Sequence, residues 1–86
     1  MAAEPPFPRP LKRSLTIRGH RTSVSLEEPF WQELRRLARA RGSSVNALVG
    51  EIDAMRTPPA SLASAIRVWV LEALRTQRGE PAGEES

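Results

Sequence analysis

The chain has 86 residues, a net charge of +3, 5% aromatic residues and no cysteine. A chain of this length forms one small domain, which leaves much of its surface unburied and favours a partner or a self-associated form. The absence of cysteine excludes disulfides and Cys-ligated metal sites, and a single histidine makes a transition-metal site a poor hypothesis, so we expect no cofactor.

Positive charge is concentrated in the first half of the chain. Residues 1–41 carry a net charge of +5, whereas residues 42–86 carry −2. A basic front half suggests a polyanionic partner there. The longest apolar stretch, at residues 68–74, is far too short to span a bilayer, and the start lacks the apolar core of a secretory signal. We therefore expect a cytoplasmic protein.

The N-terminal third changes character at residue 14. Residues 1–13 are rich in proline and end in a Lys-Arg pair, so we interpret them as a disordered basic arm. Polar and apolar residues then alternate over residues 14–26, which predicts a β-strand. Odd positions are apolar before Gly19 and even positions after it, so we expect a bulge, kink or turn at this glycine.

Helical periodicity predicts three helices after the strand. The first starts near Glu27 or Glu28 with Pro29 in its first turn, and Gly42 ends it in a left-handed conformation. The stripes expected to face the core are Phe30, Leu34, Leu37 and Ala38 in the first helix, Val45, Leu48, Val49 and Ile52 in the second, and Leu62, Ala65, Ile66, Trp69, Val70 and Ala73 in the third.

The two later helices have clear start and stop signals. Ser43 or Ser44 caps the second helix, and the Thr-Pro-Pro sequence at residues 57–59 stops it. Ser61 caps the third helix, which runs to about Gln77. We therefore expect a folded domain at residues 14–78 and a disordered tail at residues 79–86.

No later segment of the chain is predicted to pair with the strand, although its N–H and C=O groups need partners. One solution is pairing with the same strand of a second chain, which we favour because it also explains a subunit too small to bury its apolar stripes. The other is that residues 14–18 fold back on residues 21–26 through Arg18-Gly19-His20-Arg21, where Gly19 can open a two-residue type II′ turn.

The stretch RTSVSLEEPFWQELRRLARARGSSVNALV, residues 21–49, resembles the ribbon-helix-helix DNA-binding family, to which the Arc and methionine repressors belong. Together with SLTIRGHRTSVSLEE and LASAIRVWVLEAL, it is similar to a bacterial subgroup with a further C-terminal helix. The resemblance implies a mostly α fold with one short β-strand and three helices. It also implies an intertwined homodimer, in which two strands pair into an intermolecular antiparallel ribbon that enters the DNA major groove.

The resemblance also implies residue roles. The inward strand residues Thr22, Val24 and Leu26 pack on the helices. The outward ones have side chains that suit base edges, because arginine can donate two hydrogen bonds to guanine and a serine hydroxyl can donate or accept. The expected base readers are Arg21, Ser23 and Ser25.

Two further sets of residues are expected to contact the DNA backbone. The N-terminus of the second helix presents unpaired N–H groups that can bind a phosphate. The phosphate-binding residues implied by the resemblance are Ser43, Ser44, Val45 and Asn46. The basic residues expected to add weaker backbone contacts are Lys12, Arg13 and Arg18.

We therefore expect a homodimeric, sequence-specific transcriptional regulator acting as a repressor, whose partners are double-stranded DNA and a second copy of itself. An alternative is the antitoxin of a toxin–antitoxin pair, which would bind a toxin protein as well as DNA. A third is a protein-interaction module that has lost DNA binding. The only histidine, His20, and the only aspartate, Asp53, have no local catalytic signature, so we expect no enzyme. Trp31 and Trp69 could stack on bases, but their spacing favours the core.

Overall fold

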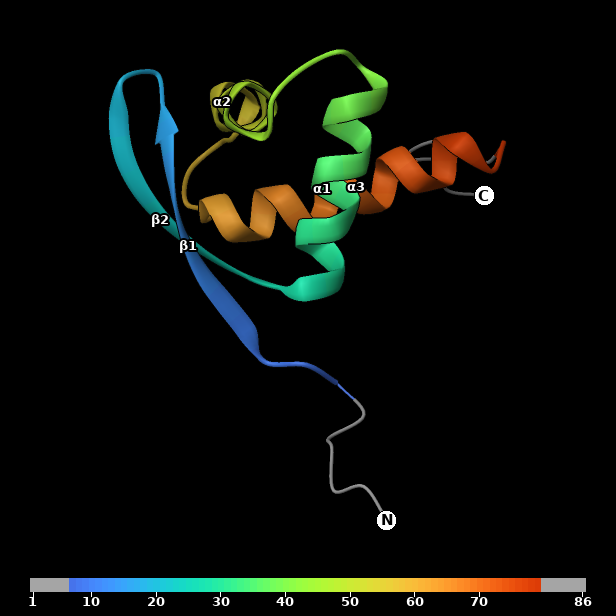
Figure 1. Cartoon of the computed structure of the whole chain (residues 1–86), viewed down its shortest axis with the longest axis horizontal. Helices are drawn as coiled ribbons and strands as arrows, with labels where there is room; N and C mark the ends of the chain where they lie inside the picture. Colours follow the sequence, from blue (N-terminus) through green and yellow to red (C-terminus); the bar gives the residue numbers. More distant parts are fainter. Residues whose placement is uncertain (1–6, 80–86) are drawn as a thin grey trace.

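The computed structural model describes residues 7–79, which form a β-hairpin followed by three helices (Figure 1). The strand-to-helix order and the third, C-terminal helix agree with the expected fold. The elements are β1 (Pro10–Ile17), β2 (His20–Glu27), α1 (Glu28–Ala40), α2 (Val45–Met55) and α3 (Leu62–Gln77).

The strand that precedes α1 finds a partner within its own chain. β1 and β2 are antiparallel over their whole length, from Ile17 opposite His20 to Pro10 opposite Glu27. A two-residue turn joins them, and both of its residues have positive φ, 52° at Arg18 and 84° at Gly19, as in a type I′ turn. The expected type II′ turn with Gly19 in its first position is therefore wrong, because His20 already pairs with Ile17 as the first residue of β2. The expected single strand is thus corrected to two, and the fold-back alternative describes the chain.

The hairpin begins earlier than expected. β1 starts at Pro10, so residues 10–13 belong to a strand instead of the arm. They are held there because Leu11 lies opposite Leu26 and its carbonyl oxygen accepts a hydrogen bond of 3.1 Å from the indole N–H of Trp31. The rest of the predicted arm and tail mostly lies outside the described residues.

The tight turn also accounts for the change of alternation at Gly19. The register places odd-numbered residues of β1 opposite even-numbered residues of β2, and directly opposed residues share a face of the sheet. Leu15 and Ile17 are therefore buried on the same face as Val24 and Leu26. The other face of the hairpin is turned away from the core, and we call it the outer face.

The helix boundaries confirm the predicted caps. α1 ends in a Schellman motif, because the N–H of Gly42 (φ 68°) donates to Arg39 O at 3.0 Å and the N–H of Ser43 donates to Ala38 O at 2.8 Å. The hydroxyls of Ser44 and Ser61 accept hydrogen bonds of 3.0 and 3.1 Å from the third backbone N–H beyond them. These caps define the starts of α2 and α3.

One apolar core lies between the inner face of the hairpin and the helices. α2 packs on β1, α3 packs on β2, and α1 contacts both of these helices. All three predicted helical stripes contribute to the core, although Trp31 takes the buried place in α1 expected for Phe30, which is half-buried. Trp69 is also only half-buried against this core. A single chain thus covers the apolar stripes for which a second chain was invoked.

None of the helices in residues 7–79 is long and apolar enough to cross a membrane.

Candidate nucleic-acid interface

The outer face of the hairpin is a row of hydroxyl and basic side chains from both strands. Three cross-strand pairs build it: Thr16 opposite Arg21, Ser14 opposite Ser23, and Lys12 opposite Ser25. Five of these residues are exposed and Ser25 is half-buried. The predicted base readers Arg21, Ser23 and Ser25 therefore share one face, as their alternation predicted.

The outer face carries two cations that are not used inside the protein. Lys12 and Arg21 take part in no ion pair or hydrogen bond among the described residues. The same is true of Arg9 and Arg39. The arginines that do form ion pairs are Arg13, Arg18, Arg35, Arg36, Arg41, Arg56, Arg67 and Arg75. Lys12 and Arg21 are thus available to an anionic ligand.

The acidic residue on this face is neutralised by α3. Glu27 forms an ion pair of 3.0 Å with Arg67, whose guanidinium also approaches Ser25 O at 3.5 Å and lies 5.8 Å from the centre of the Phe30 ring. A hydrogen bond from its own backbone and the contact with Arg67 hold the pKa of the Glu27 carboxyl below the ordinary value. α3 therefore fixes the end of β2 and leaves the outer face basic.

Arg13 and Arg18, the other two cations expected to contact the DNA backbone, have partners within the chain. Arg13 lies on the same face of β1 as the buried residues Leu15 and Ile17. Its guanidinium pairs with Glu28 at 3.2 Å and lies 5.4 Å from the centre of the Trp31 ring. Arg18, at the tip of the hairpin, pairs with Asp53 of α2 at 2.8 Å.

The Arg18 ion pair ties the hairpin tip to α2. Arg56 also pairs with Asp53, at 2.9 Å. Hydrogen bonds from Arg18 and then from Arg56 hold the pKa of the Asp53 carboxyl below its ordinary value. Because Asp53 is ionised and shared by two arginines, the hairpin tip is held against the last turns of α2.

The N-terminus of α2 has free N–H groups, but fewer than expected. The N–H of Ser43 donates to Ala38 O and its hydroxyl donates to Ser44 O at 3.2 Å, so this residue is already engaged. The hydroxyl of Ser44 is used by the cap. The N–H groups of Ser44, Val45 and Asn46 have no acceptor among the described residues. The candidate phosphate site therefore consists of the N–H groups of three residues, whereas four residues were predicted.

A groove joins this helix end to the hairpin. Thr16 and Arg18 line it on one side, and Ser44 and Asn46 line it on the other. Glu51 also borders it, but its carboxylate pairs with Arg41 at 3.2 Å. Thr16 is the outer-face residue that borders this depression, together with Ser44 and Asn46 at the start of α2.

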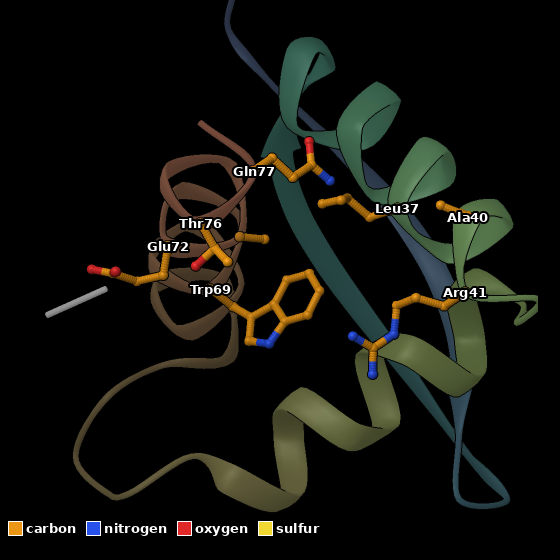
Figure 2. Close-up of a pocket in the computed structure, with 8 residues that line it drawn as sticks. Leu37, Ala40, Arg41, Trp69, Glu72, Thr76 and Gln77 are labelled. Carbon is orange, nitrogen blue, oxygen red and sulfur yellow. The ribbon is translucent and has the colours of Figure 1, made fainter. Parts of the chain in front are cut away.

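A second depression lies between α1 and α3, away from these residues (Figure 2). The indole of Trp69 forms its floor and the guanidinium of Arg41 lies 5.6 Å from the ring centre. The other ionisable group at its rim is Glu72. Within residues 7–79, no three His, Asp or Glu side chains come together in a group that could hold a metal ion.

Sequence reasoning missed half of the outer face. Ser14 and Thr16 were read as part of a strand of uncertain pairing, and Lys12 as part of the arm, so their position beside Ser23, Arg21 and Ser25 was not foreseen. The Arg-Gly turn was the available signal.

The comparisons with known proteins agree on the fold. A family model described as "Ribbon-helix-helix domain" matches residues 10–74, which includes both strands of the hairpin and most of α3. The solved structure of an uncharacterized protein from Bordetella pertussis Tohama I is similar, with a TM-score of 0.66 and 31% sequence identity over 86% of this chain. The alignment spans 64% of that longer chain. No curated protein matches the sequence.

Proposed function

Because the chain belongs to the ribbon-helix-helix family, we propose that it is a sequence-specific DNA-binding regulator of transcription that acts as a repressor. In this proposal the hairpin enters the major groove with its outer face toward the bases. The major groove is wide enough for a two-stranded ribbon, so one chain can supply both strands of a reading element. Such a regulator works in the cytoplasm, has no catalytic role and needs no cofactor.

The observation that carries the proposal is the chemistry of the outer face. It combines two unpaired cations, Lys12 and Arg21, with four hydroxyl side chains, and its acidic residue, Glu27, is already paired with Arg67. Arginine and hydroxyl groups are donors and acceptors that distinguish base edges in the major groove. A strand face that is only solvated has no physical requirement to keep unpaired carboxylates away.

In this proposal the N-terminus of α2 binds the DNA backbone and the hairpin reads the bases. The N–H groups of Ser44, Val45 and Asn46 bind a phosphate, which fixes the protein's position on the duplex without reading sequence. Arg21, Ser23 and Ser25 of β2 read the bases. Lys12 adds charge close to the backbone, and Arg13 and Arg18 contribute less because their charges are paired within the chain.

We also propose that the chain acts as a homodimer, as members of this family generally do. Two hairpins related by a two-fold axis would contact two half-sites, and the operator would then be a palindrome. Antitoxin activity is the second candidate function. It is favoured by an apolar groove between α2 and α3, which is an exposed surface of the kind that binds proteins.

Selection of bound sequences from a random DNA pool tests the proposal. We expect a palindromic consensus, and binding of the selected site that weakens steeply with added salt because phosphate contacts release counterions. Failure to retain any DNA at low salt would contradict the proposal and favour a protein-interaction module. Recovery of DNA without a consensus would contradict sequence-specific recognition.

A further inference from the structure

One acidic side chain lies on the face of the hairpin that is proposed to meet DNA. Residues 10–27 contain a single acid, Glu27, at the end of β2. Together with Arg21, Ser23 and Ser25 it occupies every second position of this strand, so it belongs to the outer face. A free carboxylate on this face would repel the phosphates of DNA. The contacts that hold the Glu27 side chain therefore bear directly on DNA binding.

Arg67 of α3 binds both oxygens of this carboxylate. Its Nε lies 3.1 Å from Glu27 Oε1, and its Nη2 lies 3.2 Å from Glu27 Oε2. This two-point contact uses the planar fork of the guanidinium, which a lysine side chain lacks. A hydrogen bond from its own backbone and the contact with Arg67 lower the pKa of the Glu27 carboxyl, so both partners are charged at neutral pH.

The guanidinium of Arg67 is also held by its surroundings. Arg67 follows Ile66, which is buried in the core and fixes this turn of α3. The guanidinium lies 5.8 Å from the centre of the Phe30 ring, and its Nη2 approaches Ser25 O at 3.5 Å. The side chains of Arg67 and Glu27 are 33% and 26% exposed, so the pair is less screened by solvent than an ordinary surface pair.

We propose that Arg67 is a positioning residue for DNA binding. By holding the Glu27 carboxylate against α3, it keeps an unpaired negative charge off the outer face. Arg67 acts through Glu27 and does not touch the DNA. In the described part of the chain, Glu27 forms ion pairs with Arg67 alone, so no other cation replaces it there. The inference rests on the DNA-binding function proposed above and assigns a part of that function to α3.

A second arginine–glutamate pair on α3 provides an internal comparison. Arg75 lies 3.7 Å from Glu72, which belongs to the same helix, so this pair does not connect α3 to the hairpin. The Arg67–Glu27 pair joins residues 40 positions apart in the sequence and does make that connection. Removal of either arginine changes the net charge by the same amount. Removal of Arg67 is the change that releases a carboxylate on the outer face.

DNA binding by variants of the full chain tests this role, on the selected site and on a scrambled site of equal length. Arg67→Gln should weaken both sites about fivefold at low salt, because the freed Glu27 carboxylate repels phosphates of any sequence. The loss should shrink as salt is added. Arg75→Gln is the matched control for charge, and it should weaken either site less than about twofold because its charge lies away from the hairpin.

Removal of the carboxylate separates positioning from a direct contact with DNA. Glu27→Gln alone should bind DNA at least as tightly as the wild type. The double variant Glu27→Gln/Arg67→Gln should return to within about twofold of the wild-type affinity, because the repelling charge is gone and coupled residues do not act additively. If Arg67 contacted a phosphate, the double variant would stay weak, and its slope of log affinity against log salt would fall by about 0.9.

A conservative variant keeps the test informative if loss of the pair unfolds the chain. Arg67→Lys retains the positive charge without the fork, so it should lose less DNA affinity than Arg67→Gln. Urea titration of each variant shows whether it is folded under the conditions of the binding assay.

Three results would overturn the inference: an unchanged affinity for Arg67→Gln, an equal loss for Arg75→Gln, or no recovery in the double variant. If the wild type binds the selected site and any of these results is obtained, the positioning role is wrong and the proposed function stands. If the wild type retains no DNA at low salt, the proposed function fails and the inference fails with it.

Discussion

The assignment of the two faces of β2 predicts opposite outcomes for neighbouring residues. Val24 is 4% exposed and lies over the helices, whereas Ser23 is exposed on the outer face. Val24→Ser removes apolar burial and places a hydroxyl in an apolar environment. We expect the free energy of unfolding to fall by about 2–4 kcal/mol. Ser23→Ala, the matched control, should change it by less than about 0.5 kcal/mol.

This loss is large for a domain of this size, whose total stability is about 5 kcal/mol. The melting temperature should fall by about 10 °C or more, since each kcal/mol shifts it by about 4–8 °C in a small domain. Urea titration with tryptophan fluorescence measures the effect, because buried Trp31 becomes solvated on unfolding. If Val24→Ser unfolds at the wild-type urea concentration while Ser23→Ala is destabilised, the inner and outer faces are reversed.

Three further predictions concern the hairpin tip, the α1 cap and the arm. The pKa of Asp53 is lowered in the folded chain, so its ion pairs stabilise the fold above the ordinary carboxyl pKa of 3.8 and are lost as pH falls through the lower folded value. Thermal melts between neutral and strongly acid pH should therefore show a smaller acid loss for Asp53→Asn than for the wild type, and parallel curves would contradict the Arg18–Asp53–Arg56 contact. Gly42→Ala should cost about 1 kcal/mol in urea titrations, because φ is 68° there, and no loss would mean that the Schellman geometry is wrong. Deleting residues 1–9 should weaken selected and random DNA by similar factors and reduce the slope of log affinity against log salt by about 0.9 if Arg9 contacts one phosphate; a changed preference at flanking bases would instead make the arm a minor-groove reader.

Local signals in the sequence predicted most of the helical part of the fold. Gly42, Ser44, Ser61 and the Thr-Pro-Pro sequence each act within one turn of the helix end that they define, so their effect is readable without tertiary contacts. The apolar stripes were also readable, apart from the exchange of Trp31 for Phe30 in α1. That exchange depends on the indole hydrogen bond to Leu11 O, which is a contact between distant residues.

The partner of the strand could not be predicted with the same certainty. A type I′ turn requires positive φ at both central residues and is usually Asn-Gly or Asp-Gly, so Arg18-Gly19 is a weak signal for it. The ion pair between Arg18 and Asp53 is distant in sequence and supports the turn from α2. Once the hairpin is known, Ser14 and Thr16 join the outer face, and residues 10–13 move from the arm to β1.

Contacts between residues distant in sequence also limited how much of the candidate site could be predicted. Alternation correctly placed Arg21 and Ser23 outward, because side chains of a strand point to opposite faces in turn. It could not distinguish free cations from paired ones. Arg13 and Arg18 proved to be paired with Glu28 and Asp53, whereas Lys12 and Arg21 are unpaired in the described part of the chain.

The most direct test of the central claim compares Arg21→Ala with Arg39→Ala on the selected DNA site and on a scrambled site of equal length. Both arginines are unpaired among the described residues, but Arg39 lies on α1 and Arg21 on the outer face. We predict that Arg21→Ala weakens the selected site by about 1–3 kcal/mol, roughly 5–150-fold, and the scrambled site much less. Arg39→Ala should affect both sites equally and weakly. Equal losses on the two sites for Arg21→Ala would contradict base reading by the outer face.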